Sequence, residues 1–207
     1  MSRQTASDVA FSDAVKAVQA QRGSRNTYAR MESGEGWPRT IDDELAAFLA
    51  EQVSFFMATA NAAGQPYIQH RGGPPGFLRV LDEHTLGLAD FRGNRQYITT
   101  GNLAENPKVH LFFIDYAQRR RIKLWGEARV VTLTDDPALV ERLMPEDYKA
   151  KAEQAILIEV AAWDVNCPQH IPQRFEAADV AAALAARDEK IASLQAEIAR
   201  LRSAQSR

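Results

Sequence analysis

A series of short apolar segments, each bounded by turn residues, occupies the middle of the chain and constrains the fold more than any other feature. Segments of this length, rich in β-branched and aromatic residues, are typical of strands in an antiparallel sheet. Two of them are joined by Asn61-Ala62-Ala63-Gly64, a turn that predicts a β-hairpin. We expect a mainly β fold with flanking helices, in which the segments supply six strands of a closed antiparallel barrel. The predicted strand segments are residues 54–60, 65–71, 77–82, 85–90, 108–115, 120–133 and 155–165.

Size and charge exclude several classes of protein. The 207 residues fit one main domain with an appendage, and the net charge of −2 gives no broad attraction to nucleic acid or to an anionic membrane. The sequence contains no apolar run long enough to span a bilayer, and residues 1–11 lack the apolar core of a signal peptide. Cys167 is the single cysteine, which excludes an intrachain disulfide and suits a reducing compartment. We therefore expect a cytoplasmic protein.

The N-terminal part predicts one helix followed by an irregular connector. Residues 8–21 repeat apolar side chains at helical spacing, with Val9, Val15 and Val18 on one side. Residues 23–38 are rich in Gly, Ser, Asn and Pro, a composition typical of a connector.

Two further helices are predicted from capping residues. Thr40 is placed to cap a helix that ends near Gln52, with acidic residues in its first turn. Thr134 is placed to cap another helix that ends near Met144. We therefore expect an N-terminal helix with a connector, a barrel domain and a C-terminal helix, at residues 1–39, 40–176 and 177–207.

The C-terminal segment has a heptad pattern. Seven residues alternate in spacing between four and three, which places them at positions a and d of a helix that pairs with another helix. We expect a coiled coil between subunits; the alternative is a single amphipathic helix that lies on the barrel. Glu197 and Arg202 occupy g-type and e-type positions, where an interhelical ion pair can form. The seven residues are Val180, Leu184, Arg187, Ile191, Leu194, Ile198 and Leu201.

Three clusters combine a cation or an amide with residues that break regular structure. They are residues 69–73, residues 92–96 and residues 166–171, and each lies at a strand end or in a loop. Such positions favour a binding site for an anionic ligand. In the second cluster a Gly-Asn-Arg turn precedes a helix, so that backbone amides, the helix dipole and the arginine converge, which suits a phosphate.

Other chemistry is not expected from the sequence. Cys167 and His170 have the spacing C-x-x-H, but one cysteine and four scattered histidines do not predict a zinc site. No feature marks Cys167 as an activated thiol, and no catalytic residue is assigned. The three tryptophans, Trp37, Trp125 and Trp163, are expected in packing rather than in contact with a cofactor.

The sequence resembles the pyridoxamine 5′-phosphate oxidase-like family of FMN-binding split barrels, over roughly residues 40 to 175. The resemblance depends on the stretches LGLADFRGNRQYITTGNLAENPKVHLFFID, GGPPGFLRVLDE and NCPQHIPQR. The second stretch is similar to a subgroup described as FMN-dependent enzymes. Asn94 and Arg95 match the first two positions of the triplet that opens the family's helix, whereas Gln96 stands where the oxidase itself has lysine. That departure argues against vitamin B6 oxidase activity.

The resemblance implies a six-stranded split barrel that forms a homodimer with FMN at the interface. It further implies an oxidoreductase that acts on a small molecule by hydride transfer through flavin N5. Arg71 and Arg95 are implied phosphate ligands, and the loop with Gln169 and His170 is implied to reach the flavin of the partner subunit. The implied cofactor-binding residues are His70, Arg71, Gly72, Arg79, Phe91, Asn94, Arg95, Gln96, Asn102, Gln169 and His170.

Two alternatives remain open at the level of sequence. The first is a non-catalytic split-barrel protein that binds flavin or haem, with His70 or His170 as the axial ligand of a haem; deazaflavin is a further possible ligand. The second makes the heptad segment the main functional part, as an assembly module.

Overall fold

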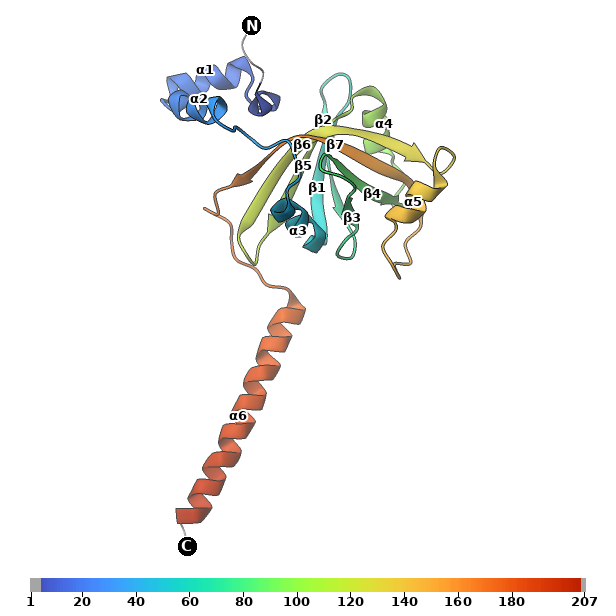
Figure 1. The fold of residues 1–207 in the computed structure, drawn as a ribbon. Coiled ribbons are helices and arrows are strands. Elements are labelled where there is room, and N and C mark those ends of the chain that lie inside the picture. The colour runs from blue at the N-terminus through green and yellow to red at the C-terminus, as the bar shows by residue number, and fades with distance from the viewer. Residues whose placement is uncertain (1–4, 206–207) are drawn as a thin grey trace. The chain divides into compact units, whose positions relative to one another are not determined.

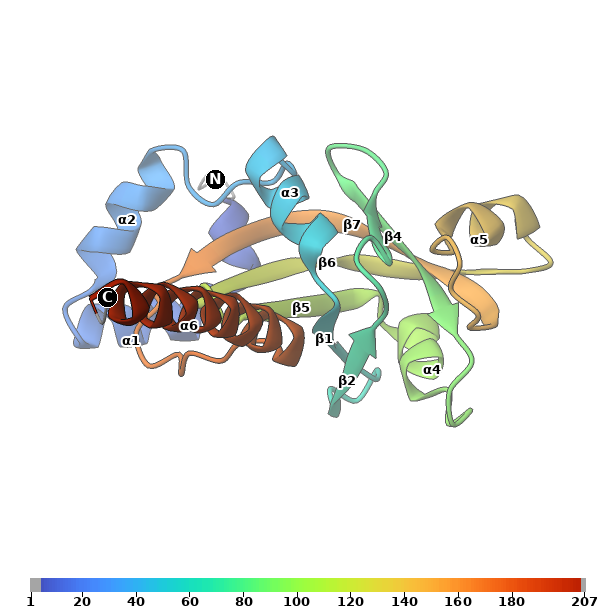
Figure 2. The same ribbon diagram turned by 90° about the horizontal axis from the view of Figure 1, so that it is seen from below.

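Residues 54–166 build a mainly antiparallel sheet of seven strands (Figures 1 and 2). The computed structural model describes residues 5–205. The sheet has the strand order β2-β1-β5-β6-β7-β4-β3. All seven predicted segments form strands, including the short β3, which pairs with β4, so the sheet has one strand more than the six-stranded barrel that was expected. The strands are β1 Ser54–Ala60, β2 Pro66–Gly72, β3 Leu78–Val80, β4 Thr85–Phe91, β5 Lys108–Asp115, β6 Arg120–Thr132 and β7 Ala152–Asn166.

An ion pair between Arg71 on β2 and Asp90 on β4 shows that this sheet is rolled into a split barrel. In the strand order, β2 and β4 are five intervals apart. In a flat sheet this separation would be about 24 Å, far beyond the reach of one arginine side chain. The predicted barrel is therefore confirmed.

The barrel interior is filled by residues that alternate along the strands. On β1, Phe55 and Met57 are 1% and 0% exposed, and their neighbours in the strand face the other way. The ring of Phe55 lies 5.8 Å from that of Phe77 and 5.1 Å from that of Phe113. Helix α3, Asp43–Glu51, adds Leu45, Phe48 and Leu49 to the same core.

The N-terminal region differs from its prediction. The expected helix over residues 8–21 is divided into η1, Ala6–Val9, and α1, Asp13–Gln21, because the Ser12 side chain accepts a hydrogen bond from the Val15 amide and starts a new helix. Val15 and Val18 are 37% and 55% exposed, so the predicted apolar side of α1 is not buried.

The expected connector also contains a helix, α2, Arg25–Ser33. Arg25 forms an ion pair with Glu32 at the other end of α2, and the helix ends at Gly34. The prediction of a connector was based on the Gly and Ser content of the whole stretch. The residues of α2 itself are compatible with a helix.

Two predicted caps are displaced by two residues along the chain. Asp42 caps α3 by accepting the Leu45 amide at 2.8 Å, and Asp136 caps α5, Pro137–Leu143, by accepting the Leu139 amide at 2.9 Å. Thr40 and Thr134 were therefore wrong as caps. In both cases an aspartate closer to the helix supplies the acceptor, with a negative charge that suits the helix start.

The three tryptophans lie in packing contacts, as expected. Trp37 stacks on Trp125 with ring centroids 4.8 Å apart, and the ring of Phe11 lies 5.0 Å from Trp37. Trp163 is buried, and its Nε1 donates to the Thr40 carbonyl at 2.8 Å. The aromatic contacts thus join the N-terminal segment to β6.

The chain divides into two compact units, and the second comprises residues 115–120 together with the segment from residue 168 onward. Within it, the Arg174 guanidinium lies 4.7 Å from the centroid of the Tyr116 ring, and Gln173 Nε2 donates to the Ala117 carbonyl at 2.9 Å. Helix α6, Ala177–Gln205, has no buried residue. Across residues 5–205, no helix is long and apolar enough to cross a membrane.

Gly126 offers a test of the sheet register. It lies at a bulge where β6 pairs with β7, and a Cβ there would be 2.3 Å from the Glu159 carbonyl oxygen. We expect Gly126→Ala to lower the free energy of unfolding by about 1–3 kcal/mol, measured by chemical denaturation. Gly101→Ala, in the exposed part of α4, Ile98–Glu105, where a Cβ meets nothing within 4 Å, should raise it by about 0.5–1 kcal/mol. Equal effects of the two substitutions would contradict the close approach at Gly126.

Candidate functional site

A small pocket of about 60 Å³ lies at the start of α4, Ile98–Glu105, between the ends of β2, β4 and β7. It brings together five residues that the family resemblance had implicated. These are Arg71, Phe91, Asn94, Arg95 and Gln96.

The loop before α4 has an unusual backbone. Arg95 and Tyr97 both have positive φ, at 62° and 54°, and the Gln96 amide donates to the Asn94 side chain at 3.2 Å. Non-glycine residues in this conformation are uncommon and cluster at functional sites. Tyr97 is the N-cap residue of α4, and no side chain among residues 5–205 makes a capping hydrogen bond there. The first backbone amides of the helix can therefore donate hydrogen bonds to an anion.

Arg71 is held in place by a set of buried polar contacts. Its Nη1 pairs with Asp90, and both side chains are 13% exposed. Asp90 also accepts a hydrogen bond from Gln154 Nε2 at 2.8 Å, and the same Nε2 lies 2.9 Å from the hydroxyl of Thr100. These contacts link β2, β4, β7 and α4 around one guanidinium group.

Two buried polar atoms of the pocket have no partner among the described residues. They are Nε of Arg71 and the hydroxyl of Thr99, a residue that is 3% exposed. A buried polar group without a hydrogen bond costs about 1–3 kcal/mol. Both groups can donate to an acceptor-rich ligand, so the pocket fits a phosphate or another oxyanion.

The rim of the pocket carries a chain of charged and polar contacts. Arg95 Nε donates to the Tyr97 hydroxyl at 3.2 Å, and this hydroxyl donates to Glu153 at 3.3 Å. Arg92 Nε lies 3.5 Å from the other oxygen of Glu153. The contact with Tyr97 raises the pKa of Arg95, which therefore stays charged at every physiological pH. The pocket and its rim contain three arginines, counting Arg71, and the two carboxylates Asp90 and Glu153. The excess of positive charge favours an anion at this site.

The structure places His70 and Gly72 apart from this pocket. Arg71 pairs across the sheet with buried Phe55, whereas His70 pairs with Phe56 on the opposite face. The His70 ring lies 5.6 Å from that of Phe56 in an edge-to-face arrangement. Strand alternation therefore separates His70 and Arg71, although they are neighbours in sequence.

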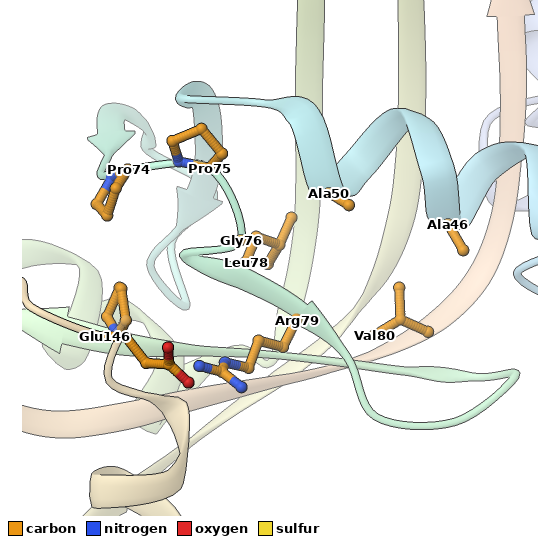
Figure 3. Close-up of a pocket in the computed structure, with 10 residues that line it drawn as sticks. Ala46, Ala50, Pro74, Pro75, Gly76, Leu78, Arg79, Val80 and Glu146 are labelled. Atoms are coloured by element: carbon orange, nitrogen blue, oxygen red, sulfur yellow. The ribbon is translucent and has the colours of Figure 1, made fainter.

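Arg79 and Asn102 also lie elsewhere. Arg79 lines a separate pocket of about 530 Å³, where its Nη2 donates to the Met144 carbonyl at 3.1 Å and its guanidinium points toward Glu146 (Figure 3). Asn102 is buried and donates from Nδ2 to the Thr59 hydroxyl at 2.9 Å, which fixes α4 to β1. Neither residue lines the pocket at the start of α4.

Gln169 and His170 belong to the second unit, and both are exposed. His170 has a positive φ of 64°. Their expected contact with the flavin of a partner subunit stays a prediction.

Asp90 and Gln154, which orient the Arg71 guanidinium, and Thr99, which adds a buried hydroxyl, were not predicted from the sequence. None of the three belongs to a recognisable motif. Asp90 had one usable signal, a charge at the end of a strand that is otherwise buried. Only the paired strands show that it meets Arg71.

A larger cavity of about 920 Å³ lies between η1 and strands β1, β5, β6 and β7. His110 lines it, and its ring centroid lies 4.9 Å from that of Trp125. Burial, together with the charge of Lys123, lowers the pKa of His110.

This lowered pKa gives a pH dependence of stability. Between the folded pKa of His110 and its ordinary value of about 6.5, the unfolded chain binds more protons, so stability falls as the pH drops through this window. We expect the free energy of unfolding to fall less steeply from about pH 7.5 to 5 in His110→Gln than in the wild type, because the variant lacks the titrating imidazole. The check is urea denaturation at each pH, and an identical slope in the two proteins would contradict it.

Comparisons with known proteins agree with the architecture. HupZ from Group A Streptococcus is 18% identical with a TM-score of 0.50, and the alignment covers 65% of this chain and 99% of that chain. A HupZ variant gives 19% identity and the same TM-score of 0.50, over 61% and 99% of the two chains. An FMN-binding protein from Syntrophomonas wolfei is 12% identical with a TM-score of 0.47, over 72% and 97%. No curated protein matches the sequence significantly.

The structural similarity to HupZ, at this level of identity, shows a shared fold. The family model described as pyridoxamine 5′-phosphate oxidase matches residues 41–167, which is more than half of the chain. This range contains the whole pocket at the start of α4 and all seven strands. The chain belongs to the pyridoxamine 5′-phosphate oxidase family, with its split-barrel fold.

Proposed function

We propose that this protein is an FMN-dependent oxidoreductase that works as a homodimer on a small-molecule substrate. One observation carries the proposal: the unpartnered Arg71 Nε and Thr99 hydroxyl lie in a single pocket at the start of a helix. Membership of the family supports FMN as the ligand.

The pocket has the donors that a flavin phosphate requires. A phosphate monoester carries a charge of about −1.5 to −2 at neutral pH and offers three strong acceptor oxygens. Arg71 would hold it through Nε while its Nη1 stays on Asp90, and Arg95 would supply a second cation from the rim. The amides at the start of α4 would complete the contacts.

The size of the pocket supports a role for a second subunit. A volume of about 60 Å³ suits the phosphate group alone. A site that encloses a complete small-molecule ligand measures about 300–1,000 Å³. The flavin ring must therefore lie outside the pocket. Gln169 and His170 of the partner subunit are the proposed contacts for the ring, and half-buried Phe91 adds an apolar wall beside the phosphate.

The chemistry of the reaction comes from the cofactor. FMN, when bound, supplies hydride transfer at its flavin ring, so the chain needs no general-base triad. The residues of this chain bind the phosphate, orient the cofactor and restrict access of water. Gln96, in place of the oxidase's lysine, removes one cation and argues against the reaction of the family's namesake.

Binding of FMN and riboflavin to matched variants tests the phosphate contacts. Arg71→Ala and Arg95→Ala should each weaken FMN about 10- to 100-fold, equivalent to about 1.4–2.8 kcal/mol, because a charged hydrogen bond is lost. Riboflavin lacks the phosphate and should bind both variants like the wild type. Arg129→Ala, an exposed arginine on β6 outside the pocket, is the control and should leave both affinities unchanged. Equal losses for FMN and riboflavin would contradict the assignment.

The native ligand is identified by mass spectrometry of the molecule released from purified protein, together with its absorbance spectrum. We expect FMN and a flavin spectrum that bleaches when NADH or NADPH is added without oxygen. A Soret band, or a colourless protein that does not bind added FMN, would overturn the proposal.

Gln96→Lys should strengthen FMN binding about 2- to 5-fold, since it adds a third cation at the rim of the pocket, where an exposed charge contributes about 0.5–1 kcal/mol. The gain should shrink at high salt, because exposed charges are screened. Titration of FMN at two salt concentrations measures it, with the exposed Gln118→Lys as control. An equal gain in FMN affinity in Gln118→Lys would show that the added net charge, and not its position beside the pocket, strengthens binding.

A further inference from the structure

We propose that α6 pairs with the α6 of a second copy of this chain as a parallel, in-register, two-stranded coiled coil. The proposal concerns a surface outside the cofactor pocket and does not rest on the identity of the cofactor. The helix is 29 residues long and buries none of them. The apolar side chains at its a and d positions stay 44% to 53% exposed. Helices in proteins gain most of their stability when an apolar face is covered.

The residue types at a and d fit two parallel helices. With Leu184 at position a, the two C-terminal heptads have isoleucine at a, Ile191 and Ile198, and leucine at d, Leu194 and Leu201. β-branched residues at a with leucine at d favour two parallel strands over trimers and tetramers.

Arg187 fixes the register and the direction of the pair. In the parallel arrangement the two copies of Arg187 share one layer, and each lies beside Asp188 of the partner subunit at position e. In an antiparallel pair, position a packs against position d of the other helix, so Arg187 would meet an isoleucine in two separate layers. The parallel arrangement therefore disrupts one apolar layer instead of two, and an axial shift would place Arg187 against apolar layers.

Charges beside the apolar layers are complementary. Parallel pairing places Glu197, at g, next to Arg202 of the partner subunit, at e. Within one helix Glu197 contacts Arg200 at 3.9 Å with both side chains largely exposed, which is a weak interaction that an interhelical pair can replace.

The pairing has a consequence for assembly. About three heptads give limited stability alone, but joining two chains raises the local concentration of their barrels to the millimolar range. Pairing of α6 would therefore stabilise a contact between the two barrels that is too weak to form by itself.

Disulfide crosslinking in the full-length chain tests the proposal, with Cys167→Ser removing the one native thiol. A cysteine at d should face its counterpart in the parallel pair. We expect Leu201→Cys to form a disulfide-linked dimer at least tenfold faster than Ala199→Cys, which lies at outward position b. Equal rates for the two variants would overturn the pairing. Crosslinking of Leu201→Cys only when it is mixed with Val180→Cys would overturn the parallel direction.

Charge substitutions provide the matched control. Adding Ile191→Glu and Leu194→Lys to Leu201→Cys should slow crosslinking at least tenfold, because the charges enter apolar layers. Adding Ala192→Glu and Ala196→Lys places the same charges at outward positions b and f and should leave the rate unchanged. Circular dichroism of both sets verifies that the barrels are folded. Unchanged crosslinking with the substitutions at a and d would contradict the proposed interface.

Discussion

The ion pair between Arg71 and Asp90 joins strands that lie almost at opposite ends of the sheet, and much of the molecule depends on it. It can form only because the sheet is rolled, and it places a cation at the point where β2, β4 and the start of α4 meet. The hydrogen bonds of Gln154 to Asp90 and Thr100 extend the same network to β7 and α4. Closure of the barrel and construction of the anion site are therefore one arrangement of side chains.

The ion pair also determines how the guanidinium can be used. With Nη1 engaged by Asp90, the Arg71 side chain is oriented before any ligand arrives, and its buried Nε stays available. Pre-orientation lowers the entropy that ligand binding must overcome. The buried hydroxyl of Thr99 also lacks a hydrogen-bond partner. Such burial is unfavourable unless a ligand supplies the missing partner, which supports ligand binding in this pocket.

Two features of the chain favour association with a second copy. The pocket is too small for more than a phosphate group, and α6 exposes a heptad pattern over its whole described length. They lie in different units and follow from different chemistry, hydrogen-bond donors in the first and apolar layers in the second. A shared dimer accounts for both without requiring that one explain the other.

The sequence by itself determined the strands, the barrel, the helix start with Asn94 and Arg95, and the heptad pattern, because each depends on local spacing. It missed α2 and misplaced two caps, since nearby residues with similar propensities compete for the same role. Only the tertiary structure separated His70 from Arg71, assigned Asn102 to a contact with Thr59, and joined Asp90 to Arg71. These outcomes depend on which face of a strand a residue occupies and on pairing between distant strands, neither of which local spacing specifies.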